Sequence, residues 1–383
     1  MSRGKYSNSI PVDLIMEISS RLPAKSITRF CCVSKLWSSM FHSPYFKDLF
    51  LTRSSKRPRL LFLIKETHNG EWLFFSSPQP HNPCEKSSLV VSAGFRLRSS
   101  KELSRLEFRG YASGLFCFTH HMWISDNEKS IVNVICPSTA QRVSLPRLTS
   151  DDKSTSFLGF DPIGKQFKVL SNHKILTLKA ENMEWRKTRY CSLTHDPKSE
   201  PICINGVLYY LAQDSSTIVC FDVRSETYKL IKSKGHEPKL INYRGKLGGV
   251  HWNYYAYGGI STTIELHLWI LEDAETQKWH NYFYTWHDNR FVDRNDVYVA
   301  GVTATGEIVV STRRIRVPFC VLFINPKKNT FQSVELEGFE DMLDIKNNEV
   351  YAFVDHVEDL KFDVVKTTYD ATSTSPPEEK HKP

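Results

Sequence analysis

The sequence lacks the features that mark secreted and membrane proteins. It has no apolar run of about 18 residues, no secretory h-region after Met1 and no N-x-S/T glycosylation sequon. Its nine cysteines are odd in number and show no C-x-x-C spacing, and Cys31 and Cys32 are adjacent. We therefore expect free, mostly buried thiols, no disulfides and no membrane span. A reducing compartment, cytoplasm and/or nucleus, is predicted.

Motifs of common enzyme classes are also missing. The chain has no G-x-S-x-G nucleophile elbow, no phosphate-binding P-loop and no G-x-G-x-x-G fingerprint. Histidines such as His251 and His287 lack the companion carboxylate or cysteine spacing of a zinc site. Cys117 and Cys203 lie in apolar stretches, where burial raises the thiol pKa and disfavours nucleophilic chemistry. The sequence predicts no catalytic residue, no metal site and no cofactor.

Positive charge is concentrated near the N-terminus. The 383 residues include 50 Lys and Arg against 42 Asp and Glu, a formal net charge of +8. Residues 1–60 hold 11 of the basic and 3 of the acidic residues, so the remainder is balanced at 39 of each. The larger part of the chain thus lacks the overall basic charge of nucleic-acid-binding domains, which argues against nucleic acid as a partner. The basic run at 53–59 indicates a solvated linker, with a weak nuclear-import signal as the alternative.

What the chain does have, in residues 10–41, is apolar side chains at the three- and four-residue steps typical of helices. Pro11 suits the first turn of one helix and Pro23 ends it. A second helical pattern covers 25–41 before Pro44 closes the region. A hairpin of two or three helices this short cannot enclose its own apolar faces. Something outside the hairpin must cover them.

Beyond residue 59 the pattern changes to short runs of Val, Ile, Leu, Phe and Tyr separated by turn residues, which is typical of strands. Six turns, 39 to 61 residues apart, each lead into an apolar strand; they lie at Ser113-Gly114, Ile163-Gly164, Asn205-Gly206, Arg244-Gly245, Thr305-Gly306 and Asn347-Asn348. With the strands that follow, each repeat holds about four strands in about 40 to 50 residues, the pattern of a β-propeller. Six blades are predicted, with five or seven as alternatives. The first hairpin, near 60–75, is expected to close the ring against the last repeat, near 349–365.

The two regions resemble two known domains in order. The I-P-x-D-L opening from Ile10, the R-L-P-x-K-S stretch from Arg21 and the V-S-K-x-W end from Val33 are similar to an F-box. The repeats resemble the kelch-like β-propeller of plant F-box-associated domains, as in Leu158-Gly-Phe-Asp and Val219-Cys-Phe-Asp. At Ala140 the sequence departs from this family, which usually has a glycine at that place in a hairpin turn.

The expected architecture is therefore a small α-helical F-box hairpin followed by an all-β propeller. Its predicted parts are a flexible N-terminus (1–7), the F-box (8–50), a basic linker (51–58), the propeller (59–368) and a disordered tail (369–383).

The F-box resemblance implies a surface that docks on a Skp-type adaptor, which tethers the chain to a cullin ubiquitin ligase. The contact residues that it implies are Ile10, Pro11, Leu14, Ile18, Leu22, Pro23, Val33 and Trp37. The alternative is that these side chains only pack the hairpin or cover the domain that follows.

Candidates for binding a target come from one propeller face. If the strands of a blade are lettered a to d from the axis outward, the b–c connections at 119–130, 251–263 and 313–319 and the d–a connection at 287–296 are long and share that face. Long loops on one face usually carry recognition, and interfaces favour aromatic and arginine side chains. The candidates are Trp252, Tyr254, Tyr255, Tyr257, Arg290, Phe291, Arg294, Arg313, Arg314 and Arg316. The last three suit an acidic or phosphorylated partner. Packing between blades, or a solvated loop, is the alternative.

The predicted function is a non-catalytic substrate-recognition adaptor of a Skp–cullin–F-box ubiquitin ligase. Docking would use the F-box, and the propeller would bind a target protein whose identity the sequence does not give. Two alternatives stay open. One is a propeller enzyme acting on a small molecule or glycan. The other is an F-box protein that recruits a partner without degrading it.

Overall fold

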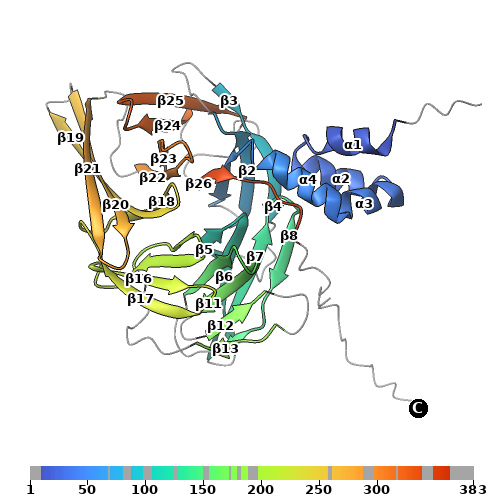
Figure 1. The fold of residues 1–383 in the computed structure, drawn as a ribbon, viewed down its shortest axis with the longest axis horizontal. Helices are drawn as coiled ribbons and strands as arrows, with labels where there is room; N and C mark the ends of the chain where they lie inside the picture. Colours follow the sequence, from blue (N-terminus) through green and yellow to red (C-terminus); the bar gives the residue numbers. More distant parts are fainter. Residues whose placement is uncertain are drawn as a thin grey trace, which may run out of the picture.

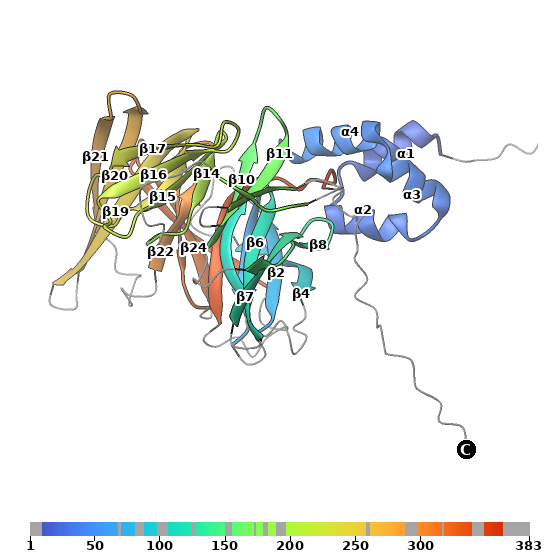
Figure 2. The ribbon, with the colours of Figure 1, turned by 90° about the horizontal axis from the view of Figure 1, so that it is seen from below.

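In the computed structural model, a small helical domain lies against one side of a ring of β-sheets (Figures 1 and 2). The structure describes the following residues: 10–67, 70–80, 88–97, 106–124, 127–149, 155–171, 174–178, 183–188, 197–257, 261–287, 297–315, 318–338 and 348–362. No helix among them is long and apolar enough to cross a bilayer.

Four helices form the N-terminal domain: α1 (Val12–Ser19), α2 (Ala24–Cys31), α3 (Lys35–His42) and α4 (Pro44–Ser54). The helical pattern over 25–41 is divided into two helices because Ser34 caps the second one, its hydroxyl accepting a hydrogen bond from the Trp37 amide at 3.2 Å. Pro44 begins α4 instead of closing the region, since proline is tolerated in a first turn. Helix α4 therefore extends into the predicted linker.

The strands form six sheets, the blades of a propeller, which confirms the predicted blade number. From the axis outward, blade 1 holds β5 (Leu106–Ala112), β6 (Leu115–Ile124), β7 (Asn127–Cys136) and β8 (Gln141–Ser144), with β9 (Leu148–Thr149) on β7. Blade 2 holds β10 (Ser156–Asp161), β11 (Gln166–Ser171), β12 (Lys174–Thr177) and β13 (Arg186–Lys187). Blade 3 holds β14 (Ile202–Ile204), β15 (Val207–Leu211), β16 (Thr217–Asp222) and β17 (Thr227–Lys232).

The remaining blades contain the longest strands and the closure of the ring. Blade 4 holds β18 (Lys239–Tyr243), β19 (Lys246–Tyr257), β20 (Ser261–Asp273) and β21 (Lys278–His287). Blade 5 holds β22 (Val297–Val302), β23 (Ile308–Thr312), β24 (Phe319–Asn325) and β25 (Thr330–Glu337), with β3 (Ser88–Val90) as a fifth strand. Blade 6 holds β26 (Glu349–His356), β1 (Arg59–Lys65), β2 (Trp72–Pro78) and β4 (Ser92–Leu97).

Blade 6 closes the ring with strands from both ends of the propeller sequence. β26 pairs antiparallel with β1, with Leu63 opposite Tyr351 and Phe62 opposite Ala352. The predicted closure is thus confirmed. Apolar faces of neighbouring blades then pack together, as where Phe116 of blade 1 meets Phe74 and Phe353 of blade 6.

Five of the six predicted turns join strands a and b of a blade. At Asn205-Gly206, for example, both residues have positive φ, 49° and 87°, as a tight hairpin turn requires. The sixth position differs, because Asn348 directly precedes β26 and so opens an innermost strand. Ala140, in the β7–β8 turn, has a φ of 57°. The left-handed turn is therefore kept although a methyl group replaces the usual glycine hydrogen.

Two of the predicted b–c loops are strands. Residues 119–124 and 127–130 belong to β6 and β7, and 251–257 and 261–263 belong to β19 and β20, which pair as far as Tyr257 and Ser261. The sequence prediction was wrong here because Tyr, Trp and Thr, interpreted as loop recognition residues, are also strong strand formers.

Candidate functional site

The helical domain exposes a set of large apolar side chains. Leu14 and Ile18, one turn apart on α1, are 54% and 59% exposed, and Val33 before α3 is 68% exposed. Ile10, Pro11 and Pro23 are exposed as well. No described residue of the chain covers these six predicted contact residues. Exposed side chains of this size usually mark an interaction surface when they are contiguous.

The other two predicted contact residues lie partly inside the domain. Trp37 packs against Phe30 and Phe41, with ring centroids 5.1 and 5.5 Å apart, and Leu22 packs against the same core. Truncation of Trp37 would therefore disturb the helical core as well as any interface.

Sequence reasoning missed three further exposed apolar residues. Val12, Leu36 and Tyr45 are 49%, 71% and 66% exposed. The capping residue Ser34 could have marked the start of a helix at residue 35, but helical phase does not predict the exposure of Leu36, because Leu36 and the buried Met40 are four residues apart and lie on similar sides of the helix. We use "docking surface" for Ile10, Val12, Leu14, Ile18, Val33 and Leu36.

One acidic residue braces the domain beside this surface. The Glu17 carboxylate accepts hydrogen bonds from Arg21 at 2.8 Å and from Arg53 of α4 at 2.5 Å. These contacts hold the pKa of Glu17 below its usual range, the hydrogen bond from Arg21 being the largest cause. The contact with Arg53 joins the first helix, which carries Leu14 and Ile18, to the last one.

A short segment after β26, residues 357–362, ties the helical domain to the propeller; we call it the tie segment. Leu360 is 8% exposed and packs into the helical core beside Ile27 and Phe46. Phe362 packs into the interface of blades 1 and 2. Glu358 accepts a hydrogen bond at 3.3 Å from the Ala24 amide in the first turn of α2. Part of the apolar surface of the hairpin is thus covered by the chain itself.

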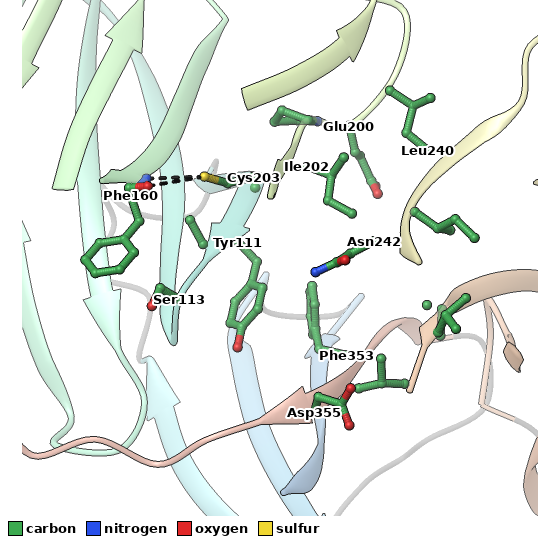
Figure 3. Close-up of a pocket in the computed structure, with 18 of the residues that line it drawn as sticks. Tyr111, Ser113, Phe160, Glu200, Ile202, Cys203, Leu240, Asn242, Phe353 and Asp355 are labelled. Atoms are coloured by element: carbon green, nitrogen blue, oxygen red, sulfur yellow. Dashed lines mark hydrogen bonds between the residues drawn. The ribbon is translucent and has the colours of Figure 1, made fainter. Parts of the chain in front are cut away.

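The innermost strands of the blades surround a central channel. At the end nearer the a–b turns, a cavity of about 400 Å³ is lined by Tyr111, Phe160, Asn242, Phe353 and other side chains, with Asp355 at its edge (Figure 3). Asp355 accepts a hydrogen bond from Gln79 at 2.6 Å, and burial raises the pKa of its carboxyl. The Asp355 carboxyl at this end of the channel therefore stays neutral to a higher pH than an exposed aspartate does.

Burial keeps several thiols of the propeller in the protonated form, including one in the channel. Cys203 lies against Phe160, whose amide is 3.3 Å from its sulfur, and burial raises the pKa of Cys203 (Figure 3). Burial likewise raises the pKa of Cys117 and of Cys220 to about 12. These pKa shifts agree with the sequence-based expectation of thiols that are poor nucleophiles. Among the described residues there is no group of three or more His, Cys, Asp or Glu that could hold a metal ion.

The opposite end of the channel brings two predicted target-binding residues to one cavity. This cavity of about 450 Å³ is lined by Trp252 and Arg313, among others. The Arg313 guanidinium lies over the Tyr298 ring at 5.6 Å. The two lysines of this mouth are paired with glutamates, Lys239 with Glu200 at 2.6 Å and Lys198 with Glu237, and Glu349 accepts a hydrogen bond from the Tyr351 hydroxyl at 2.7 Å. Within the described residues Arg313 has no carboxylate partner.

The structure describes the other target-binding candidates only in part. Arg314 is exposed beside Arg313, and its backbone bridges to Glu349. Tyr254, Tyr255 and Tyr257 lie in β19, but their side chains are outside the description. The remaining candidates lie outside the described residues: Arg290, Phe291, Arg294 and Arg316.

A helical domain with an uncovered apolar surface, joined to a six-bladed propeller with an open channel, defines a two-part binding protein. Family comparisons give each part a name: residues 8–49 match the F-box domain and residues 59–357 match the F-box associated beta propeller domain. The chain therefore belongs to the family of F-box proteins that carry this propeller, a membership that supports a role as a substrate receptor.

Relatives in Arabidopsis thaliana resemble the chain along its length. The putative F-box protein At1g33020 is 48% identical, over 100% of this chain and 71% of the relative. The putative F-box protein At5g42430 is 46% identical over 99% of this chain and 100% of the relative, and the F-box protein At3g57590 is 47% identical over 92% and 91%.

Proposed function

We propose that the chain is the target-binding subunit of a Skp–cullin–F-box ubiquitin ligase, acting in the cytoplasm and/or nucleus. The F-box docks on a Skp-type adaptor and, through it, on a cullin, and the propeller holds a target protein. The chain itself supplies no catalytic group. It contributes proximity, because a held target has a high effective concentration at the ubiquitin-loaded enzyme.

The observation that supports docking best is the docking surface. Its apolar side chains are exposed although the propeller closes on itself and the tie segment already fills the helical core. Burying large apolar side chains such as Leu14 and Leu36 in a partner interface is favourable. The net charge of residues 1–60 also suits a partner with an acidic surface, which would speed association.

Binding to a purified Skp-type adaptor tests the proposal. Leu14→Ala combined with Leu36→Ala is expected to cost about 2 kcal/mol or more, which is roughly 30-fold in affinity. Ile163→Ala is the matched control, because Ile163 is an equally exposed apolar residue, at 71%, in a propeller turn. Isothermal titration of the folded proteins measures all three. Equal affinity for wild type and the double variant contradicts the docking role.

For the target, we propose the channel mouth lined by Trp252 and Arg313. A guanidinium that pairs with no described carboxylate and lies over an aromatic ring, beside a half-buried tryptophan, suits an acidic or phosphorylated segment with an apolar neighbour. Proximity labelling under proteasome inhibition, with and without the F-box, would identify such targets. Target turnover then separates a ligase subunit from an F-box protein that recruits without degradation.

A further inference from the structure

The outer edge of blade 4 differs from the outer edges of the other blades. β21 is ten residues long, and its only formally charged residue is Lys278 at one end. It pairs with β20, and no described strand pairs with its other edge. In both views of the ring, β21 lies at the end of the molecule farthest from the helical domain (Figures 1 and 2). A partner on this edge would leave the docking surface free.

Each of the other blades protects its outer strand in a recognisable way. In blades 1 and 2 the strands β8 and β13 have only four and two residues. In blade 3, β17 carries Lys229 and Lys232. In blade 6, β4 has six residues and its pairing with β2 shifts register in the middle, whereas the register shift of β20 against β21 lies at the end of that pairing, between Leu271 and Asp273. Short strands, lysines and irregularities are the usual means by which edge strands avoid pairing with other chains.

In blade 5, the fifth strand β3 covers the outer edge of β25. β3 pairs with β25 in parallel, with Leu89 opposite Leu336, and the Val91 amide donates to the Glu337 carbonyl at 2.8 Å. An outer blade edge of this propeller can therefore accept a further strand without disturbing the ring.

Two large aromatic side chains, one on each face of β21, are exposed among polar neighbours, which are Lys278, His280, Asn281 and Thr285. Phe283 is 53% exposed and Tyr282 40% exposed. The Phe283 ring packs edge-on against His267 at 4.6 Å, and Tyr282 stacks parallel to Tyr284 at 6.4 Å. These contacts hold the rings in place before any partner binds, which lowers the entropy cost of binding.

We propose that β21 pairs antiparallel with β21 of a second copy of this chain, joining the two blade-4 sheets across a two-fold axis. A two-fold contact places the same patch on both partners, and cross-strand aromatic pairs stabilise such sheets. Antiparallel pairing also puts the two Lys278 side chains at opposite ends of the strand, about 30 Å apart, whereas parallel pairing would bring them together. Because β21 has a single formal charge, at one end, two copies can pair antiparallel without bringing like charges together.

The size of the contact sets its expected strength. About ten residues a side is fewer than the roughly 20–30 of a standard interface, so we expect a dissociation constant in the micromolar range. Sedimentation velocity of the full-length chain is expected to show monomer near 1 µM and dimer near 100 µM, concentrations on the order of those that bracket such a constant.

Substitutions on two outer strands test where the contact lies. Phe283→Lys is expected to weaken the dimer at least about tenfold, because it places two lysines against an aromatic strand. Tyr282→Lys is the second variant if Phe283→Lys does not fold. Leu230→Lys on β17, a residue 41% exposed on the neighbouring blade, is the matched control and should leave the dimer intact.

Hydrogen exchange at low and high protein concentration supplies the local readout. The β21 amides are expected to gain protection at high concentration and the β17 amides are not. A chain that stays monomeric near 100 µM overturns the proposal. A dimer that resists both β21 variants, or that protects a different surface, also overturns it. None of these results bears on adaptor docking, which the titration of the Leu14 and Leu36 variants measures separately.

Discussion

Replacing Leu360 with alanine tests whether the tie segment is part of the F-box core. Leu360 is 8% exposed and contacts the core of a domain more than 300 positions earlier in the chain. The substitution removes three carbon atoms, and at roughly 0.8 kcal/mol each the lost transfer free energy is about 2.4 kcal/mol. The cavity left behind adds to this cost, so we expect a loss of about 2.5 to 4 kcal/mol.

The loss should be confined to the helical domain and its contact with the propeller. Hydrogen exchange of α2 and α3 amides reports the free energy of local opening, and about 2.5 kcal/mol corresponds to roughly 60-fold faster exchange. Blade 4, which has no residue in the two clusters that contain Leu360 and Phe362, is the internal reference.

A neighbouring substitution separates packing from charge. Lys361→Ala removes an ion pair with Asp48 in which the two side chains are 38% and 68% exposed, and such surface pairs contribute about 1 kcal/mol or less. Its effect on α2 and α3 exchange should therefore be small. If Leu360→Ala leaves exchange in these helices unchanged, the tie segment is only an accessory contact and the reasoning is refuted.

Two other predictions concern single positions. Burial raises the pKa of the Glu358 carboxyl, so its contribution to stability is present at low pH and is lost as pH rises through the folded pKa. Glu358→Gln keeps an acceptor for the Ala24 amide without the charge, and its melting temperature should exceed that of wild type increasingly as the pH rises above the ordinary glutamate pKa, until Glu358 is ionised in the folded protein as well; a difference independent of pH contradicts this. Ala140→Gly should stabilise the protein by about 0.5 to 1 kcal/mol, because glycine adopts the φ of 57° without strain. Urea unfolding measures it, with Ala274→Gly, in a β20–β21 turn position whose φ is not positive, as a control that should destabilise.

Local patterns were sufficient to predict the general architecture. Helical spacing from Ile10 onward and the turn pairs such as Asn205-Gly206 depend on residues that are close in sequence, so both the helical domain and the blade repeat could be predicted. Ring closure could also be predicted, because an unpaired first hairpin and an unpaired last repeat leave two edges to satisfy.

Features that depend on distant contacts could not be predicted. Leu360 lies in a six-residue stretch with no periodicity, and its partners are in the first 50 residues. Trp252 and Arg313 meet at one channel mouth only because β19 and β23 stand on neighbouring blades. The aromatic run of β19 shows the opposite problem, since strand formers and interface residues are the same amino acids.

Blade 6 and the tie segment determine when, during synthesis of this protein, the ring and the helical core can be completed. A ribosome produces the helical domain and β1 first, yet the partners of both, β26 and Leu360, are among the last described residues to be made. During translation the F-box core stays incomplete and one edge of blade 6 stays open. A polypeptide that stops before residue 349 would lack both the closing strand β26 and Leu360, so the ring and the helical core would be incomplete together.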